Sequence, residues 1–220
     1  MSEPLYERMR PRRLGDVLGQ PKAVRLAQSF VTEGVGGRAY WLSSKKAGVG
    51  KSTIARLMAE TLADPVNIYE TIGSELTVDT LRDYGRWQSQ FALGTRPGRA
   101  FVVDEAHTIS RRGVEMLLKL LETGRIPRHV AWFFTTRRCG EARLFDDYDD
   151  ADALLSRCEL MALTDQGIAK AAAPRLREIV RLAGFPDGHD DRYYAKIVND
   201  CGGSIRAAIS EALNRARIVS

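Results

Sequence analysis

The sequence has few cysteines and no long apolar segment, and both absences narrow what the chain can be. Its 220 residues include three cysteines, Cys139, Cys158 and Cys201, and none of them stands in a CxxC pair. This pattern indicates neither a disulfide framework nor a zinc site, and it favours a reducing, cytoplasmic setting. No apolar run approaches the ~20 residues of a membrane span. The N-terminus, MSEPLYERMRPRR, lacks the apolar core of a signal peptide. We therefore expect no membrane partner.

The composition that remains is ordinary for a globular protein. The hydrophobic fraction is 44% and the charged fraction is 28%, as in most soluble domains. The length allows one large or two small domains with a substantial core. The net charge of +5 comes from 33 basic and 28 acidic residues. It permits a polyanionic partner, although most such basic excess is simply solvated surface.

A glycine-rich segment, AGVGKST at residues 47–53, is the most informative stretch of the chain. Residues 39–42 before it are apolar and favour a strand, and the apolar residues of 53–60 recur at helical spacing. A glycine turn between a strand and a helix is the setting of a phosphate-binding loop, because its backbone N–H groups and the helix N-terminus face one anion. The segment therefore predicts nucleotide binding.

The residues at the end of this loop have the chemistry that a nucleotide needs. Lys51 is expected to reach the β- and γ-phosphates, and the Ser52 hydroxyl is expected to bind Mg²⁺. One position departs from the pattern, since the glycine expected five residues before Gly50 is replaced by Lys45. We expect binding to persist with an altered first turn, because the later glycines, the lysine and the serine are kept.

An acidic pair follows a second apolar segment. Residues 100–103 predict a strand buried on both faces, and Asp104 and Glu105 come directly after it. An aspartate at the carboxyl end of such a strand can help to hold Mg²⁺, and the adjacent glutamate can polarise an attacking water. Two motifs in this order make a solvated acidic turn a poorer explanation.

A third apolar segment, residues 130–134, predicts another strand, which ends in Thr135 and Thr136. A hydroxyl there could touch the γ-phosphate or the attacking water. Between the last two strands Ser110 is expected to cap a helix that stops near residues 123–124. Alternating strands and helices predict an α/β fold with a parallel sheet and helices on both sides.

The order of these motifs resembles one family, the AAA+ ATPase subunits of DNA-polymerase clamp loaders, that is, bacterial gamma/tau and replication factor C small subunits. The Ser-Arg-Cys element discriminates best, since many AAA+ motors share the other motifs. The resemblance covers essentially the whole chain. Five segments carry it: RPRRLGDVLGQ (10–20), VVDEAHTISRRGVEMLLKLLET (102–123), HVAWFFTT (129–136), LLSRC (154–158) and GGSIRAAI (202–209).

The resemblance implies a AAA+ P-loop NTPase fold in two parts. Residues 1–160 would form the nucleotide-binding domain, a parallel sheet flanked by helices. Residues 161–220 would form a small all-α lid domain that carries sensor 2. We expect lid helices over residues 167–183, 191–201 and 204–218, with Thr164 and Asp165 capping the first of them.

The same resemblance implies the residues that contact the nucleotide. Lys51 and Ser52 would hold phosphate and Mg²⁺, and Asp104 would share the metal. The N-terminal box would contact adenine. The implied contact set is Tyr6, Arg10, Pro11, Val17, Leu18, Lys46, Ala47, Gly48, Val49, Gly50, Lys51, Ser52 and Thr53.

Four further residues would carry the hydrolysis. Glu105 would activate the water, and Thr136 aligns with sensor 1, although Thr135 is close enough to compete. Arg206 would be the sensor-2 arginine, and its alternative is an exposed helix charge. Arg157 would be an arginine finger acting on ATP in a neighbouring subunit, so that hydrolysis depends on assembly. The alternative for Arg157 is a surface arginine in an ion pair.

Several features depart from the family pattern. Lys46 replaces a small residue or proline in the phosphate loop, the zinc-binding insertion of gamma/tau subunits is absent, and residues 146–152 form an extra acidic stretch. That stretch favours a solvated loop, with repulsion of misplaced DNA or contact with a basic partner as the alternative. Family members continue into a helical collar, whereas this sequence ends at Ser220 after the sensor-2 helix. The sequence leaves open whether the collar is truncated or assembly differs.

Nucleic-acid contacts are expected to be to phosphates. In the family, DNA lies inside a spiral of subunits, and helix N-termini and arginines suit its phosphates. Solvated helix charges explain each candidate equally well. His107 and His129 are isolated in the sequence and favour structural roles. The DNA candidates are Thr77, Arg82, Arg86, Arg111 and Arg112.

The leading functional hypothesis is an ATPase subunit of a clamp loader, with ATP and Mg²⁺ as its ligands. It would work in a homo- or hetero-oligomer that loads a sliding clamp on primer–template DNA, in the cytoplasm of a bacterial or phage-infected cell. A second hypothesis is a Holliday-junction branch-migration motor, whose N-terminal box is similar. A third is a nucleotide-dependent scaffold with little hydrolysis, which Lys45 and the absent collar motivate.

Overall fold

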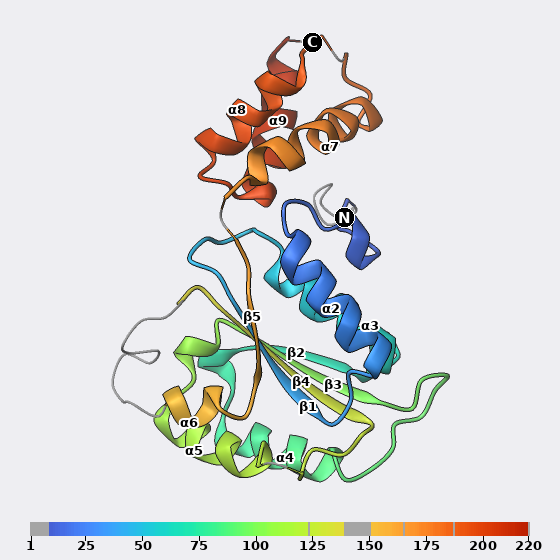
Figure 1. Ribbon diagram of the computed structural model, residues 1–220, viewed down its shortest axis with the longest axis vertical. Helices are drawn as coiled ribbons and strands as arrows, with labels where there is room; N and C mark the ends of the chain where they lie inside the picture. The colour runs from blue at the N-terminus through green and yellow to red at the C-terminus, as the bar shows by residue number, and fades with distance from the viewer. Residues whose placement is uncertain (1–8, 123, 139–150, 165, 187, 220) are drawn as a thin grey trace.

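One parallel sheet forms the centre of the larger part of the molecule (Figure 1). The computed structural model describes residues 9–122, 124–138, 151–164, 166–186 and 188–219. Within them the strands run in the order β2-β3-β4-β1-β5, and every pairing is parallel. The expected parallel sheet is confirmed. The strands are β1 Arg38–Ser43, β2 Ile68–Ile72, β3 Arg99–Asp104, β4 Val130–Thr136 and β5 Glu159–Ala162.

The central strands are buried on both faces, which explains why their sequences are continuous apolar runs. Successive side chains alternate between the two faces. Tyr40 and Phe133 therefore stack on one side, with ring centroids 5.0 Å apart. Phe101 and Trp132 pack together on the other side, at 4.4 Å. This alternation anchors a separate helical layer on each face.

Helices cover both faces of the sheet, as expected (Figure 1). One face is covered by α2 Pro21–Glu33 and α3 Lys51–Leu62. The other is covered by α4 Val78–Trp87, α5 Arg111–Leu120 and α6 Ala151–Leu155. The Ser110 hydroxyl caps α5 by accepting from the Gly113 amide at 3.2 Å, although α5 ends earlier than expected. Short 3-10 helices lie at Leu14–Asp16, Pro65–Asn67, Gly73–Glu75 and Ala106–Thr108.

The last three helices form a separate helical part at one end of the molecule (Figure 1). They are α7 Ile168–Leu182, α8 Asp191–Asp200 and α9 Ile205–Val219. Their buried side chains are continuous with the core between α2, α3 and the sheet. The cap expected for α7 was wrong. Gly167 caps it, with a φ of 72°, while the Thr164 hydroxyl accepts from the Gln166 amide instead; Asp165 lies outside the described residues.

The link between the sheet and the helical part is tied to the N-terminal segment. Gln20 is 1% exposed, and its side-chain amide donates to the carbonyl of Thr164 at 2.8 Å and accepts from the amide of Thr164 at 2.9 Å. Since β5 continues to Ala162, a boundary at residue 160 would divide a strand of the sheet. Among the described residues, no helix is long and apolar enough to cross a membrane.

Candidate functional site

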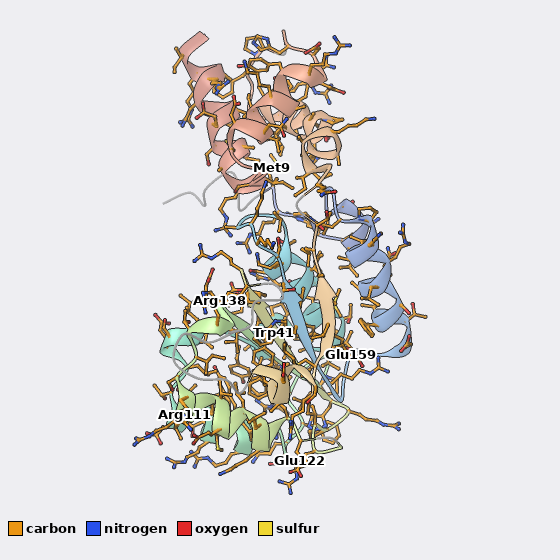
Figure 2. The ribbon with its side chains drawn as sticks, turned by 60° about the vertical axis from the view of Figure 1, so that its left-hand side comes forward. Met9, Trp41, Arg111, Glu122, Arg138 and Glu159 are labelled. Carbon is orange, nitrogen blue, oxygen red and sulfur yellow. The ribbon has the colours of Figure 1, made fainter. Side chains whose placement is uncertain are left out.

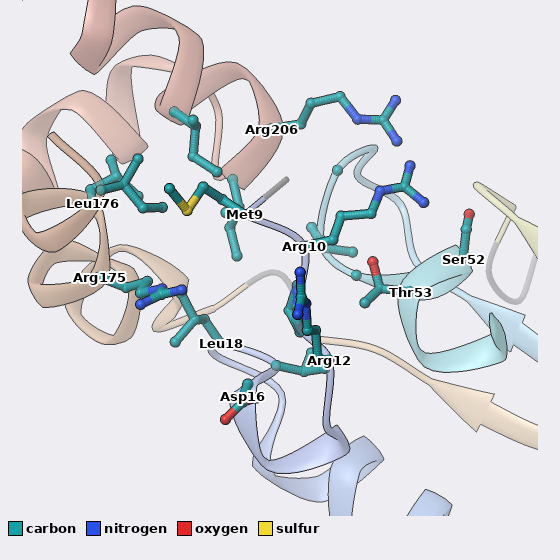
Figure 3. A pocket seen from close by; sticks show the side chains of 18 of the residues that line it. Met9, Arg10, Arg12, Asp16, Leu18, Ser52, Thr53, Arg175, Leu176 and Arg206 are labelled. Atoms are coloured by element: carbon teal, nitrogen blue, oxygen red, sulfur yellow. The ribbon is translucent and has the colours of Figure 1, made fainter. Parts of the chain in front are cut away.

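A cavity of about 690 Å³ lies where the N-terminal segment, the glycine loop and the helical part meet (Figure 3). Most of the expected nucleotide contacts line it, whereas Lys46 and Ala47 do not, and Tyr6 lies outside the described residues. The volume falls within the range of small-molecule sites. The lining includes the expected residues Arg10, Pro11, Val17, Leu18, Gly48, Val49, Gly50, Lys51, Ser52 and Thr53.

The glycine loop is packed between two other parts of the chain. Gly48 and Gly50 have φ values of 71° and 107°, which favour glycine. A Cβ on Gly48 would lie 2.3 Å from the hydroxyl of Ser204, and one on Gly50 would lie 3.2 Å from a methyl of Val17. The amide of Ile205 donates to the Gly48 carbonyl at 3.1 Å. The loop is thus in close contact with both the N-terminal segment and the start of α9.

The lysines of the loop occupy different positions. Lys51 is 8% exposed, and its ammonium donates to the carbonyl of Lys46 at 2.8 Å. The side chain of Lys46 extends toward Gly203, where it lines a separate cavity of about 340 Å³. Lys45 is exposed. The side chains of Lys45 and Lys46 therefore lie outside the loop, and Lys51 is the lysine inside it.

Asp104 joins the loop to the end of β4. Its Oδ1 accepts hydrogen bonds from Ser52 Oγ at 2.8 Å and from Thr135 Oγ1 at 2.6 Å. A hydroxyl beside a carboxylate fits Mg²⁺, which prefers oxygen ligands and usually keeps substrate phosphates and waters as its others. The described residues hold no cluster of three or more His, Cys, Asp or Glu side chains that could bind a metal alone. The donor set therefore fits Mg²⁺ bound together with a nucleotide.

Glu105 has an unusual backbone conformation and a charged neighbour. Its φ of 52° and ψ of 43° are left-handed, and it is the one non-glycine residue with positive φ among those described. Such conformations cost about 1–3 kcal/mol and cluster at functional sites. Its carboxylate is 3.2 Å from Nε of Arg137. The carboxylate of Glu105 therefore lies just after the carboxyl end of β3, where it is paired with Arg137.

The two threonines at the end of β4 have different partners. Thr135 donates to Asp104, whereas the Thr136 hydroxyl lies 3.2 Å from Nδ1 of His107. Thr136 is 1% exposed. His107, which is isolated in the sequence, is thus not isolated in space.

Two arginines extend toward the same side of the cavity. Figure 3 shows Arg10, from the N-terminal segment, and Arg206, from α9, both directed toward the side where Ser52 lies. Arg206 is exposed. Arg12 and Arg175 also line the cavity, so together with Lys51 it has five cationic residues in its lining, which suits a polyphosphate.

Arg157 does not line this cavity. Its Nη1 donates to the carbonyl of Ala153 in α6 at 2.5 Å, and its Nε is buried without a hydrogen-bond partner in the described structure. It precedes β5, whose first residue, Glu159, pairs with Tyr40 of β1. Because β5 runs parallel to β1, Arg157 lies at the amino end of the strands, whereas the glycine loop follows the carboxyl end of β1. Next to it Cys158 packs against the sheet, and burial raises the pKa of its thiol to about 12.

The expected DNA residues lie on α4 and α5 or at their starts. Thr77 caps α4 by accepting from the amide of Thr80. Arg82 pairs with Asp79, Arg86 with Asp83, and Arg111 with Glu115; Arg112 is exposed. Figure 2 shows Arg111 on the outer surface, at the end of the molecule away from the helical part. Exposed pairs of this kind are weak and exchangeable, so contact of these residues with phosphate stays a prediction. Of the acidic stretch, residues 146–150 lie outside the described part.

Several residues that line the cavity were not expected from the sequence. The apolar ones on α7 and α9 follow a helical stripe that marks a buried face, but periodicity alone does not tell which partner the stripe contacts. Others belong to the N-terminal segment, whose sequence does not indicate which of its side chains face the cavity. The unexpected lining residues are Met9, Arg12, Gly15, Asp16, Arg175, Leu176, Ile179, Ile205 and Ile209.

Comparison with known proteins identifies the family of the chain. The family described as "ATPase family associated with various cellular activities (AAA)" matches residues 44–165, which is more than half of the chain. The expected P-loop NTPase fold, a parallel sheet followed by a helical C-terminal part, is confirmed. The structure of the RuvB Holliday junction branch migration motor of Thermotoga maritima is similar, with a TM-score of 0.65 and 21% identity, over 95% of this chain and 64% of that one.

Among curated proteins, the chain is similar to DNA polymerase III subunits. It is 29% identical to subunit gamma of Buchnera aphidicola (strain APS) over 94% of this chain and 59% of that protein. It is 27% identical to subunit tau of Escherichia coli K12, over 94% of this chain and 33% of that protein. RuvB of a Parafrankia species is 30% identical over 54% of this chain and 32% of its own length. The chain therefore spans between one third and three fifths of these relatives.

Proposed function

Because the chain belongs to the AAA family of ATPases, we propose that it binds and hydrolyses ATP as a subunit of a DNA-polymerase clamp loader. The observation that carries the nucleotide part is the convergence of Lys51, Arg10 and Arg206 on one cavity beside the pair of Ser52 and Asp104. Clustered cationic side chains beside an oxygen-ligand pair suit a metal-bound triphosphate.

The proposed roles follow from the chemistry of each group. The N–H groups of the glycine loop and Lys51 hold the β- and γ-phosphates, and Ser52 and Asp104 hold Mg²⁺, which when bound neutralises phosphate charge. The N-terminal segment and the apolar residues of α7 enclose the base. Glu105 accepts the proton of the attacking water, and Thr135 or Thr136 orients that water or the γ-phosphate.

Two arginines complete the site from outside the sheet. Arg206 reaches the γ-phosphate from α9, so we take residues after Ala162 as the lid domain. Arg157 acts on ATP bound to a neighbouring subunit. Its position at the amino end of the strands, away from the glycine loop at the carboxyl end of β1, supports action between subunits rather than within one. Hydrolysis therefore depends on an oligomer.

The clamp-loader role rests on the similarity to DNA polymerase III subunits, which extends over 94% of the chain. The proposed partners are other loader subunits, a sliding clamp and primer–template DNA. Thr77, Arg82, Arg86, Arg111 and Arg112 are the proposed phosphate contacts. We place this activity in the cytoplasm of a bacterial or phage-infected cell.

The test is ATP turnover measured with the chain alone, with primed DNA, with a candidate sliding clamp and with both. The expected result is stimulation by clamp and primed DNA together. Native mass measurement with a non-hydrolysable ATP analogue would establish in parallel whether the chain forms an oligomer. Turnover that neither DNA nor clamp alters would count against the clamp-loader role.

A branch-migration motor is the second candidate, because its likeness extends to the fold and to the sequence of the AAA part. A four-way DNA junction in the same assay separates the two. Stimulation by the junction, together with movement of its branch point, would favour this candidate. A nucleotide-dependent scaffold would bind ATP and show no turnover under any of these conditions.

A further inference from the structure

His107 lies between two residues of the site that come from different strands. Its Nε2 is 3.4 Å from Oε2 of Glu105, and its Nδ1 is 3.2 Å from the hydroxyl of Thr136. Its side chain is 11% exposed. The ring therefore connects the end of β4 with the acidic residue that follows β3.

The hydrogen bonds around Thr136 are compatible with one tautomer of the neutral ring, which satisfies both contacts. The Arg138 amide donates to Thr136 Oγ1 at 3.1 Å, so the hydroxyl's own proton can be directed to Nδ1 of His107. A neutral imidazole that accepts at Nδ1 carries its proton on Nε2. That proton faces the carboxylate of Glu105.

The backbone of Glu105 is held in place by several contacts, whereas its carboxylate has two different side-chain neighbours. Its carbonyl accepts from both the amide and the hydroxyl of Thr108, each at 2.8 Å. A Cβ on Gly73 would lie 2.6 Å from the same carbonyl oxygen. The main chain is thus confined, and the direction of the carboxylate is decided by its side-chain neighbours.

Those neighbours differ in their mobility. Arg137 is 54% exposed and pairs with the carboxylate from the outer side, where a long flexible side chain fixes little. His107 is nearly buried, short and held at its other nitrogen. Of the two, His107 is better able to impose one carboxylate orientation.

We propose that His107 is a positioning residue that couples the end of β4 to Glu105. Any contact that the threonine hydroxyl makes with nucleotide or water then changes the bond to Nδ1 and, through the ring, the orientation of the carboxylate. This inference rests on the proposed ATP hydrolysis, in which Glu105 activates the water. It assigns to His107 no direct contact with ATP.

The test compares three substitutions that keep different parts of the ring's bonding. His107→Ala removes both contacts, His107→Asn keeps a polar atom near the position of Nδ1, and His107→Gln keeps one near Nε2. Turnover rate and KM are measured under conditions in which the wild type hydrolyses ATP, and the affinity for a fluorescent ATP analogue shows that each variant retains its nucleotide site. His189→Gln and His189→Ala are matched controls, since His189 is exposed and stacks on Tyr193 in the helical part.

The expected result is a fall in kcat of about 10- to 100-fold for His107→Ala, with analogue affinity and KM near those of the wild type. His107→Gln should recover most of the rate, and His107→Asn should remain slow. Unchanged kcat in His107→Ala, or equal recovery by both amides, would overturn the coupling while leaving the proposed function intact. A wild type without turnover in any condition would instead overturn the proposed hydrolysis, and this inference with it.

Discussion

The two sides of the candidate site are completed to different degrees within one chain. On the sheet side, Lys51 is buried and Asp104 already accepts two short hydrogen bonds. On the other side, Arg206 is exposed on α9, and Arg157 donates to the carbonyl of Ala153 in the preceding helix α6, at the amino end of the strands. The groups proposed to hold phosphate are thus positioned by the sheet, whereas the arginines proposed to promote hydrolysis lie on elements that would have to move or to meet a neighbour.

This difference has a physical origin. Residues at the carboxyl ends of parallel strands are fixed by the sheet, so their mutual distances are set when the core forms. Arginines on a lid helix or on the connection before an edge strand are held by a few weak contacts. The buried Nε of Arg157, which has no hydrogen-bond partner in the described structure, makes the present position of that side chain costly to keep.

The largest expected effect is that of Arg157, which does not line the cavity of its own chain. Arg157→Ala should lower ATP turnover of the assembled oligomer by about 10³–10⁵-fold, because it removes the charge that stabilises the transition state in the neighbouring subunit. Nucleotide affinity of the isolated chain should stay unchanged. Arg181→Ala, an exposed arginine of α7, is the matched control. Equal turnover in the oligomers of wild type and Arg157→Ala would show that the site is complete without a neighbour.

Glu105 belongs to both sides of the comparison: its backbone is fixed by the sheet side, and its proposed role is in hydrolysis. Glu105→Gln should reduce turnover by about 10²–10⁴-fold while ATP still binds, because the amide cannot accept the proton of the water. Rapid-quench measurement of hydrolysis and a separate binding titration distinguish the two steps. If the wild type hydrolyses ATP and this variant does not, the scaffold hypothesis fails; comparable rates would remove Glu105 from the mechanism.

The strands that position the sheet side could be predicted from the sequence, and the edge strands could not. The central strands β1, β3 and β4 are buried on both faces and appear as continuous apolar runs. β2 and β5 lie at the edges, and their sequences, IYETI and ELMA, mix polar and apolar residues without a clear period. Short segments of that kind are indistinguishable from loops by pattern alone.

The site shows the same division between residues that a local sequence pattern predicts and residues that only the fold brings together. The glycine loop and the acidic pair have fixed local spacing, so their residues could be identified directly. His107 could not, because its partner Thr136 lies on another strand, and only the sheet brings the two together. The lining by Leu176 and Ile179 likewise depends on how the helical part packs over the loop. Gly167 capped α7 in place of the expected side chains because its left-handed backbone can start the helix there without one.

A smaller effect is expected on the sheet side itself. Lys51→Ala should weaken ATP binding by about 1.5–3 kcal/mol, or roughly 10- to 150-fold in Kd, because it removes a buried charged donor to phosphate. Lys45→Ala is the matched control, since Lys45 is exposed at the start of the same loop. The readout is titration with a fluorescent ATP analogue. An equal loss in both variants would mean that the loop attracts ATP by general charge and not through the buried lysine.

The smallest expected effect concerns the connection between the two sides. Gln20→Leu has nearly the same volume but leaves the amide and carbonyl of Thr164 without the partners that Gln20 now provides. Each lost bond to a buried group costs about 1–3 kcal/mol when nothing replaces it. Water can reach the exposed Thr164, so the free energy of unfolding should fall toward the lower end of that range. Urea denaturation measures this change, with Gln28→Leu, an exposed position of α2, as control. An unfolding midpoint equal to that of the wild type would show that the link to the helical part is held by apolar packing alone.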